Sequence, residues 1–453
     1  ILFMINNLVP SIKFINHASV VLENEDTKLL SDPWYFGNVF HEGWSLIYEN
    51  DEEEILETLK TITHIWISHE HPDHLSIPFF KKNKDLLKNR NIKILFQETI
   101  DKRVINFVKS LNLEIIELKN KEKYEIGKNF SIKCIKFGFY DSALLVNINE
   151  YKIYNLNDCP LNSTENIKLF RKKFGSCDVL LTQFSYASWK GGKNNHAWRV
   201  KSAKEKTQTL INQATILEAR TIIPFASFIK FSNIRNSYLN ENRNTPDTLI
   251  DETKNTKINL VFLKPNEKQY LSNLKQEYET LNFWRNKILE SNNQPLIDYK
   301  SKFSLDELNV SFLNYKKRIF KKNSLNFLKI IRLIPFIGAF KKIILKIENF
   351  EKCIEFDIFA EKIRTVEFNY DIKLSADSFS YILNNSFGFD TLTVNGCFEQ
   401  GKKNGFEKMT KLMAIENLNN LGIYFKPSII FNFRVILIFL KLLNKVKNNL
   451  INT

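Results

Sequence analysis

Three histidines and an aspartate lie within six consecutive residues of this chain of 453 residues, in the segment 69–74 with the sequence HEHPDH. Imidazole nitrogens and carboxylate oxygens are the side-chain atoms that hold divalent transition metals in proteins. Alternating ligands on a short loop can point at neighbouring positions in space. We therefore predict that His69 and His71 bind one metal ion, and that Asp73 and His74 bind a second ion nearby.

The elements around this segment are short and apolar. Residues 65–67 form an apolar run that predicts a buried strand leading directly into the histidines. A surface loop that is rich in histidine by chance is the competing interpretation, and the position after a buried strand argues against it. Residues 11–35 alternate between apolar and polar side chains, which predicts two strands joined by a turn at Glu25-Asp26.

Strand and helix signals continue along the chain. Further short buried strands are predicted at 152–154, 179–181 and 221–223, with a helix from about 200 to 218 between the last two. One long polar helix is predicted over 265–290. These patterns suggest three parts: a catalytic domain over 4–262, a helical and basic connecting region over 263–349, and an accessory α/β domain with a basic tail over 350–453.

The net charge of +15 is concentrated in two stretches that contain no acidic residue. Ten lysines and arginines lie between 316 and 346, and five lie between 426 and 447. Both stretches are also apolar, so a contact with an anionic membrane surface is one interpretation. A helix that packs on the core with a solvated lysine face is the other. Nucleic acid is not an expected partner, because no aromatic–basic interleaving accompanies the charge.

The five cysteines are scattered and form no CxxC pair. This spacing argues against a disulfide scaffold, a zinc ribbon and an iron–sulfur site. It favours a reducing compartment, so we expect a cytoplasmic protein, peripheral to the inner membrane surface if the basic stretches contact lipid.

A histidine-rich HxHxDH segment after a strand resembles the signature of the metallo-β-lactamase superfamily. The segments 17–20 (HASV) and 31–34 (SDPW) are similar to the branch that holds CMP-N-acetylneuraminate hydroxylases and ascorbate-phosphate-type lactonases. The resemblance extends over about residues 11–250. It implies an α+β fold, an αββα sandwich with a metal site at one edge of its sheets, and here a C-terminal helical and α/β extension.

The resemblance also implies further ligands. The family supplies a third histidine to the first metal, but the matching place in this chain holds Asp141, which becomes the candidate. Asp158 fits the position of the aspartate that bridges both metals. The family's late histidine is missing, and His196 either substitutes for it or faces the substrate. Asp73 and His196 are the candidate catalytic residues.

Two residues are expected to support the ligands rather than bind metal. Asp32 is placed to hydrogen-bond a ligand histidine. His17 is expected to have a similar supporting role. The competing interpretation is that His17 is a structural histidine whose hydrogen bonds are made within the core. The candidate substrate contacts are a basic–aromatic cluster and three polar residues that alternate along a segment expected to be extended: Lys190, Trp198, Arg199, Asn236, Tyr238 and Asn240.

A carboxylate in place of an imidazole makes the ligand set harder, which favours iron or manganese over zinc. The leading expectation is two iron ions in a hydroxylase that acts on a nucleotide sugar or another anionic precursor. Such an enzyme needs a separate electron donor, because the chain lacks the CxH and CxxH pairs of a Rieske cluster. The alternative is a zinc- or manganese-dependent hydrolase of a phosphoester or lactone. A non-catalytic membrane-surface protein is a third class, supported only by the basic stretches.

Overall fold

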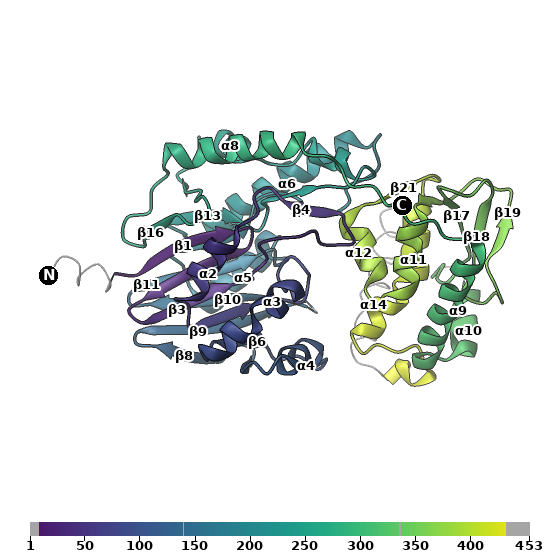
Figure 1. Cartoon of the computed structure of the whole chain (residues 1–453), viewed down its shortest axis with the longest axis horizontal. Helices are drawn as coiled ribbons and strands as arrows, with labels where there is room; N and C mark the ends of the chain where they lie inside the picture. Colours follow the sequence, from purple (N-terminus) through teal and green to yellow (C-terminus); the bar gives the residue numbers. More distant parts are fainter. Residues whose placement is uncertain (1–8, 139, 335–336, 432–453) are drawn as a thin grey trace. The chain divides into compact units, whose positions relative to one another are not determined.

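The computed structural model describes residues 9–138, 140–334 and 337–431, and it divides the chain into two compact units, residues 1–298 and 299–453 (Figure 1). The sequence had suggested three parts with boundaries after 262 and 349. Residues 263–298 instead belong to the first unit, because a strand and a helix of this segment complete its sheet and its core.

The strand that leads into the histidine-rich segment lies in a seven-stranded sheet of order β16-β1-β2-β3-β5-β6-β7. Strands β3, β5, β6 and β7 are parallel neighbours, so their carboxyl ends share one edge of the sheet. The strands are β1 (Ser11–Asn16), β2 (Ser19–Asn24), β3 (Thr27–Ser31), β5 (His64–Ile67), β6 (Lys93–Gln97), β7 (Ile115–Leu118) and β16 (Lys268–Tyr270).

A second seven-stranded sheet has the order β15-β13-β12-β11-β10-β9-β8. Its strands β11, β12, β13 and β15 are parallel, while β8 to β11 form an antiparallel meander. The strands are β8 (Lys123–Gly127), β9 (Phe130–Phe137), β10 (Asp141–Ile148), β11 (Tyr151–Asn157), β12 (Val179–Gln183), β13 (Thr221–Phe225) and β15 (Asn259–Leu260). A small ribbon pairs β4 (Trp44–Leu46) with β14 (Ile229–Phe231).

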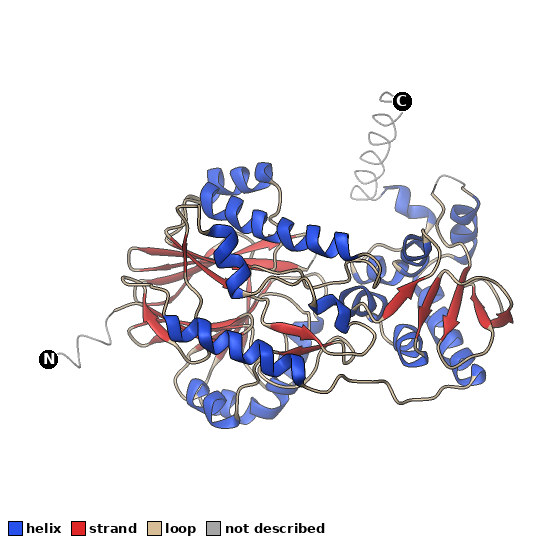
Figure 2. Ribbon diagram, turned by 90° about the horizontal axis from the view of Figure 1, so that it is seen from above, coloured by secondary structure: helices blue, strands red, loops and turns tan. Residues whose placement is uncertain are grey.

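Helices enclose the strands of this unit, as Figure 2 shows. One face of the first sheet packs with α2, α3 and α4 in a separate core, and the opposite face shares a large core with the second sheet, α5, α6, α7 and α8. The αββα sandwich that the resemblance implies is confirmed. The helices are α2 (Glu52–Leu59), α3 (Ile77–Asn89), α4 (Arg103–Ser110), α5 (Thr164–Phe174), α6 (His196–Ile216), α7 (Pro246–Thr253) and α8 (Tyr278–Asn293).

Two expectations of local structure are wrong. Residues 11–35 form three strands, because a second turn at His17-Ala18 separates β1 from β2. Residues 265–290 are not one helix, because 268–270 pair with β1 and the helix begins only at Tyr278. That helix buries Trp284 against Phe228, so it is anchored to the core rather than polar throughout.

The second unit is a smaller α/β domain, which confirms the expected C-terminal extension. Its five-stranded sheet has the order β19-β18-β17-β20-β21 and is antiparallel except between β17 and β20. Its elements are α9 (Leu305–Lys322), α10 (Leu325–Leu333), β17 (Ile343–Ile347), β18 (Cys353–Phe356), β19 (Arg364–Val366), β20 (Ile372–Leu374), α11 (Ala376–Asn384), α12 (Gly388–Asn395), β21 (Phe398–Gln400), α13 (Gly405–Met413), α14 (Ile415–Asn420) and the 3₁₀ helix η3 (Pro427–Phe431).

All five cysteines are free thiols, as the sequence predicts. Among the described residues, each helix is too short or too polar to cross a lipid bilayer.

Candidate metal centre

The first group of candidate ligands joins the loop after β5 to the end of β11. His69, His71 and Asp158 each offer a ligand atom within 4.8 Å of the others. The Nε2 of His69 lies 3.0 Å from the Nδ1 of His71 and 3.8 Å from the Oδ2 of Asp158. Three ligand atoms that face one position suit a transition metal ion.

The second group brings the first hairpin of the chain to the same loop. His17, from the turn between β1 and β2, lies with its Nε2 3.4 Å from the Oδ2 of Asp73. The Nε2 of His74 is also 3.4 Å from that oxygen, and all three residues are buried. These atoms again lie within 4.8 Å of one another.

Asp158 lies between the two groups. Its Oδ2 is 3.8 Å from the Nε2 of His69 in the first group and 3.7 Å from the Nε2 of His74 in the second. A carboxylate in this position has one oxygen in reach of both sites. The geometry therefore suits the bridging role that the resemblance implies for Asp158.

The polar atoms of the two groups supply a test of whether metal ions fit. Buried polar atoms normally find a hydrogen-bond partner, because an unpaired one costs about 1–3 kcal/mol. Five ring or carboxylate atoms here have none within the described part of the chain: His17 Nδ1 and Nε2, His74 Nε2, Asp73 Oδ1 and Asp158 Oδ1. Metal ligation would satisfy one nitrogen of His17 and the atoms of the other three residues. The residues present therefore fit a dinuclear centre.

Asp32 holds the ligand loop from behind. It follows the end of β3, and its Oδ1 accepts the backbone N–H of Ser68 at 2.7 Å. Its Oδ2 accepts the Ser68 hydroxyl at 2.8 Å and lies 2.9 Å from the Nδ1 of His74. A carboxylate on Nδ1 directs Nε2 toward the metal position and raises its basicity. Asp32 therefore has the supporting geometry that was expected of it.

Strained backbone surrounds the centre. His17, Asp32, Asn157 and Ala226 have φ angles of 32°, 36°, 41° and 52°, a region that costs non-glycine residues about 1–3 kcal/mol each. His17, Asp32 and Ala226 directly follow β1, β3 and β13, and Asn157 is the last residue of β11. The strain persists because neighbouring contacts hold it, such as the 2.7 Å hydrogen bond from the Ala226 N–H to the His17 carbonyl.

The buried histidines differ in the direction in which burial and nearby charges shift their pKa. Burial lowers the pKa of His17 and of His69, which leaves their ring nitrogens neutral. Burial also lowers the pKa of His74, but the carboxylates of Asp73, Asp158 and Asp32 outweigh it and raise the pKa to about 10. Burial raises the pKa of Asp73, yet the imidazoles of His74 and His17 outweigh it and hold that pKa below its usual range.

The structure gives His17 a different place from the one expected. Instead of a supporting position, its ring stands in the second ligand group, and neither ring nitrogen has a hydrogen-bond partner among the described residues. A histidine in a hairpin turn gives no sequence signal of this kind, because the contact that places it comes from Ala226, two hundred residues later. Asp141, the expected third ligand, begins β10 and lies in neither group.

Arg199 and Tyr238 take part in the packing of the loop before α6. The Arg199 guanidinium is buried and donates to the carbonyl of Gly192 at 2.7 Å and to that of Lys193 at 3.2 Å. It also lies over the Tyr238 ring, whose hydroxyl donates to the carbonyl of Gly191 at 3.2 Å. Their expected contact with substrate stays a prediction, and these hydrogen bonds give both residues a structural role.

Asn236 and Asn240 are similarly engaged. The amide of Asn236 donates to the carbonyl of Gly43 at 2.9 Å, and that of Asn240 donates to the carbonyl of Phe231 at 2.8 Å. The expected extended conformation is wrong, because Ser237–Asn240 form a 3₁₀ helix. Their role as substrate contacts stays untested.

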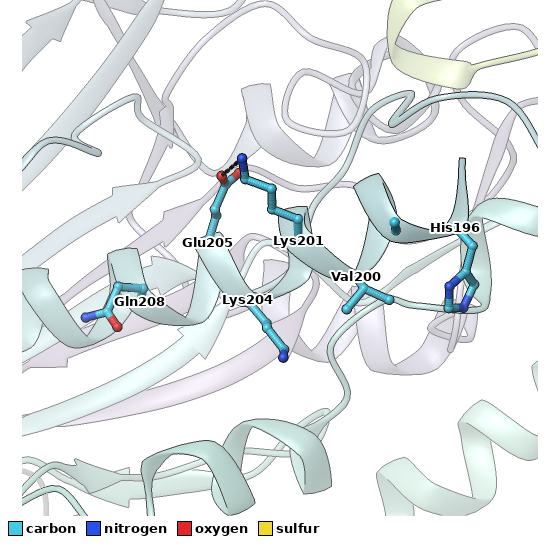
Figure 3. A pocket seen from close by; sticks show the side chains of 7 residues that line it. His196, Val200, Lys201, Lys204, Glu205 and Gln208 are labelled. Carbon is cyan, nitrogen blue, oxygen red and sulfur yellow. Dashed lines mark ion pairs between the residues drawn. The ribbon is translucent and has the colours of Figure 1, made fainter. Parts of the chain in front are cut away.

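His196 and Trp198 lie at the exposed start of α6. His196 lines a surface pocket along this helix together with Val200, Lys204 and Gln208, as Figure 3 shows. Its Nε2 is 3.2 Å from the side-chain amide of Asn242, and it belongs to neither ligand group. Lys190 is half-buried in the loop that follows β12.

Comparison with known proteins gives the following relations. Residues 11–224 match the family model described as "Beta-lactamase superfamily domain". The cytidine monophosphate-N-acetylneuraminic acid hydroxylase of Macaca mulatta is 28% identical over 258 residues, which are 52% of this chain and 42% of that protein. The aligned part of the chain thus spans less than half of this curated relative.

Two solved structures align with the chain at low identity. CmlA, a diiron β-hydroxylase from Streptomyces venezuelae, aligns with a TM-score of 0.41 and 12% identity, covering 58% of this chain and 54% of that one. A possible metal-dependent hydrolase from Veillonella parvula DSM 2008 aligns with a TM-score of 0.44 and 12% identity, covering 58% of this chain and 99% of that one.

Proposed function

We propose that the chain, whose residues 11–224 match the model described as "Beta-lactamase superfamily domain", is an iron-dependent hydroxylase of a nucleotide sugar or a similar anionic precursor. The observation that carries the proposal is the pair of ligand groups joined by Asp158, which together offer four imidazoles and two carboxylates, with Asp32 supporting His74. Imidazole binds iron as well as zinc, and the two carboxylates add harder ligands, so the set is compatible with iron. The relation to a cytidine monophosphate-N-acetylneuraminic acid hydroxylase supports the choice of substrate class.

The two groups hold the reaction's metal centre, which as iron would supply dioxygen activation. The chain's own residues prepare it. Asp32 holds Nδ1 of His74 and the backbone of Ser68, so the loop cannot turn away. Buried His17 and His69 exclude water from the inner side of the centre. A hydroxylase also consumes two electrons and two protons per turnover, so the proposal includes a separate electron-donor protein.

Hydrolysis is the second candidate function. Deep burial around two ligand groups equally suits a zinc or manganese centre that activates water. The substrate would be a phosphoester or a lactone. A dinuclear centre would stabilise the negative charge that develops on it in the transition state. The observation in its favour is the composition of the first group, because two histidines and one aspartate also form a common zinc ligand set.

Metal content and product identity distinguish the two functions. The full chain is purified without added metal and without nickel chromatography, and its metals are measured by elemental analysis. It is then incubated with dioxygen, a reductant and CMP-N-acetylneuraminic acid, and the molecular mass of the product is measured by mass spectrometry. Two irons per chain and a product heavier by one oxygen atom are expected. Two zinc ions per chain together with hydrolysis of a phosphodiester or lactone would contradict the hydroxylase proposal and support the hydrolase.

Matched variants tie either activity to the centre. Asp158→Ala removes the carboxylate shared by both groups and is expected to lose metal and product together. His64→Gln is the control, because His64 begins β5 at the end away from the ligand loop, where its Nδ1 lies 2.8 Å from the Thr63 hydroxyl. Normal activity of Asp158→Ala would overturn the assignment of the site.

The proposal places the enzyme in a reducing cytoplasm, which suits five free cysteines. It also includes a peripheral contact with the inner membrane surface through the exposed side of α10. This contact would bring the enzyme to anionic lipid or to a substrate held at the membrane.

A further inference from the structure

Lys206 is a half-buried lysine in the middle of α6, the helix that packs against β12. Its ammonium donates a hydrogen bond to the side-chain oxygen of Gln183, the last residue of β12. Strand β12 runs parallel to β11, with Thr182 opposite Asn157, so Gln183 lies beside the position from which Asp158 projects. Lys206 therefore reaches the ligand edge of the second sheet from behind the strands.

A chain of hydrogen bonds joins Lys206 to the candidate metal centre. The Gln183 amide donates to the carbonyl of Ala226 at 3.3 Å, and the Ala226 N–H donates to the carbonyl of His17 at 2.7 Å. Asp158 is the acidic group whose charge acts on the Lys206 ammonium. The lysine is thus held in place next to the centre without an ion-pair partner within 4 Å among the described residues.

A second ammonium lies near the first. Lys190 is half-buried in the loop after β12, and its charge acts on Lys206. Burial lowers the pKa of both lysines, that of Lys206 to about 8. Two like charges brought together under partial burial are costly, and the carboxylates of Glu205 and Asp158 offset part of this cost for Lys190 and Lys206 respectively. In the described part of the chain, Lys190 has no hydrogen bond or ion pair of its own.

The centre is more exposed at Asp158 than at its most buried histidines. The Asp158 side chain keeps 23% of its surface exposed, whereas the side chains of His69 and His74 keep 0% and 1%. A ligand that approaches the centre therefore meets it on the side of the first group, where Asp158 and His71 are half-buried. An ammonium has three N–H donors, and the bond to Gln183 uses one of those of Lys206.

We propose that Lys206 and Lys190 form an anion-binding pair that holds a phosphate or carboxylate group of the substrate beside the metal centre. This inference rests on the proposed function for the identity of the substrate, but not for the existence of the site. The anionic group lies between the two ammonium groups and sets the distance from the reacting atom to the centre. Lys206 acts as a positioning residue, and the same chemistry serves a phosphate or a carboxylate.

Equilibrium binding to the metal-loaded full chain tests the pair without turnover. The probes are CMP, which carries a phosphate, and free N-acetylneuraminic acid, which carries a carboxylate. We expect Lys206→Gln to weaken binding of one of them by at least tenfold. Lys206→Arg is expected to keep binding within about threefold, because it retains the charge. Lys204→Gln is the matched control on the exposed side of the same helix and is expected to match the wild type.

The probe that loses affinity identifies the anionic group. Metal content and the midpoint of thermal unfolding are measured for each variant, so a general loss of structure is recognised. Unchanged binding of both probes in Lys206→Gln with full metal content would overturn the inference. So would equal losses in Lys206→Gln and Lys206→Arg, which would indicate a packing role. If neither hydroxylation nor hydrolysis is found but CMP binding depends on Lys206, the proposed function fails and the anion site stands.

Discussion

His17 and Asp73 face each other across the candidate metal centre, with the Nε2 of one 3.4 Å from the Oδ2 of the other. They come from the first hairpin of the chain and from the loop after β5. Neither ring nitrogen of His17 has a hydrogen-bond partner in the part of the chain that the structure describes. A buried imidazole of this kind is best satisfied by a cation.

Replacing His17 by alanine is expected to reduce the metal content from two ions per chain to about one. The second group would keep only Asp73 and His74, whereas the first group keeps all its members. Elemental analysis of the purified variant measures the loss. His64→Gln serves as the control, and a full complement of two ions in His17→Ala would show that His17 is a core histidine after all.

Asp32→Asn is expected to weaken metal binding by about 10- to 100-fold without removing a ligand. An amide cannot accept from the Ser68 N–H, the Ser68 hydroxyl and His74 as the carboxylate does, and it lowers the basicity of the His74 ring. Competition with a chelator of known affinity measures the change. If Asp32→Asn kept the wild-type affinity, Asp32 would be only a turn residue.

If the lysine pair binds the phosphate of CMP, the affinity for CMP is expected to fall as the pH rises through about 8. Burial lowers the pKa of Lys206 to about 8, the charge of Asp158 raises it and that of Lys190 lowers it. The ammonium binds an anion and the neutral amine does not, so affinity is full below this pKa and lost above it. The Kd should then rise by up to about tenfold per pH unit.

The pH dependence is measured between pH 7 and 9.5, where a phosphate monoester has already lost its second proton. Lys206→Arg removes the dependence, because a guanidinium keeps its charge over this range. A profile of Lys206→Arg that still bends near pH 8 would assign the titration to another group.

The proposed membrane contact would involve α10 and the end of α9. Of the ten basic residues between 316 and 346, five are used within the second unit, for example Arg332 with Asp357 at 2.9 Å and Lys342 with Glu355 at 2.7 Å. On α10, Ile330 and Leu333 are 57% and 78% exposed. This exposed apolar side and the lysines around it form the surface that would meet lipid.

Changing Lys321, Lys322 and Lys329 together to glutamine is expected to weaken binding to vesicles containing phosphatidylserine. Each lysine near an anionic surface contributes about 1 kcal/mol, so the partition coefficient should fall by about 100-fold. Sedimentation with vesicles measures it. Lys342→Gln is the control, because Lys342 is already paired. Equal sedimentation of the triple variant and the wild type would leave the basic stretch as the solvated face of a packed helix.

The local sequence determined the parts of the site that lie close together along the chain. His69, His71, Asp73 and His74 occupy one short loop after a buried strand, so the local backbone brings them together once that strand forms. The patterns of apolar residues likewise predicted the strands at 65–67, 152–154, 179–181 and 221–223 and the helix that became α6. The second basic stretch, 426–447, lies for the most part outside the described residues.

Tertiary structure alone decided which distant residues join that loop. His17 reaches the second ligand group because Ala226 holds the hairpin turn, and Lys206 reaches the ligand edge because α6 packs on β12. Arg199, which the sequence suggested for substrate, is used to fix a loop. Such outcomes depend on contacts between residues far apart in the chain. The spacing of residue types along the chain determines local geometry, but it cannot specify which of several polar side chains a long-range contact will bury, pair or leave facing the site.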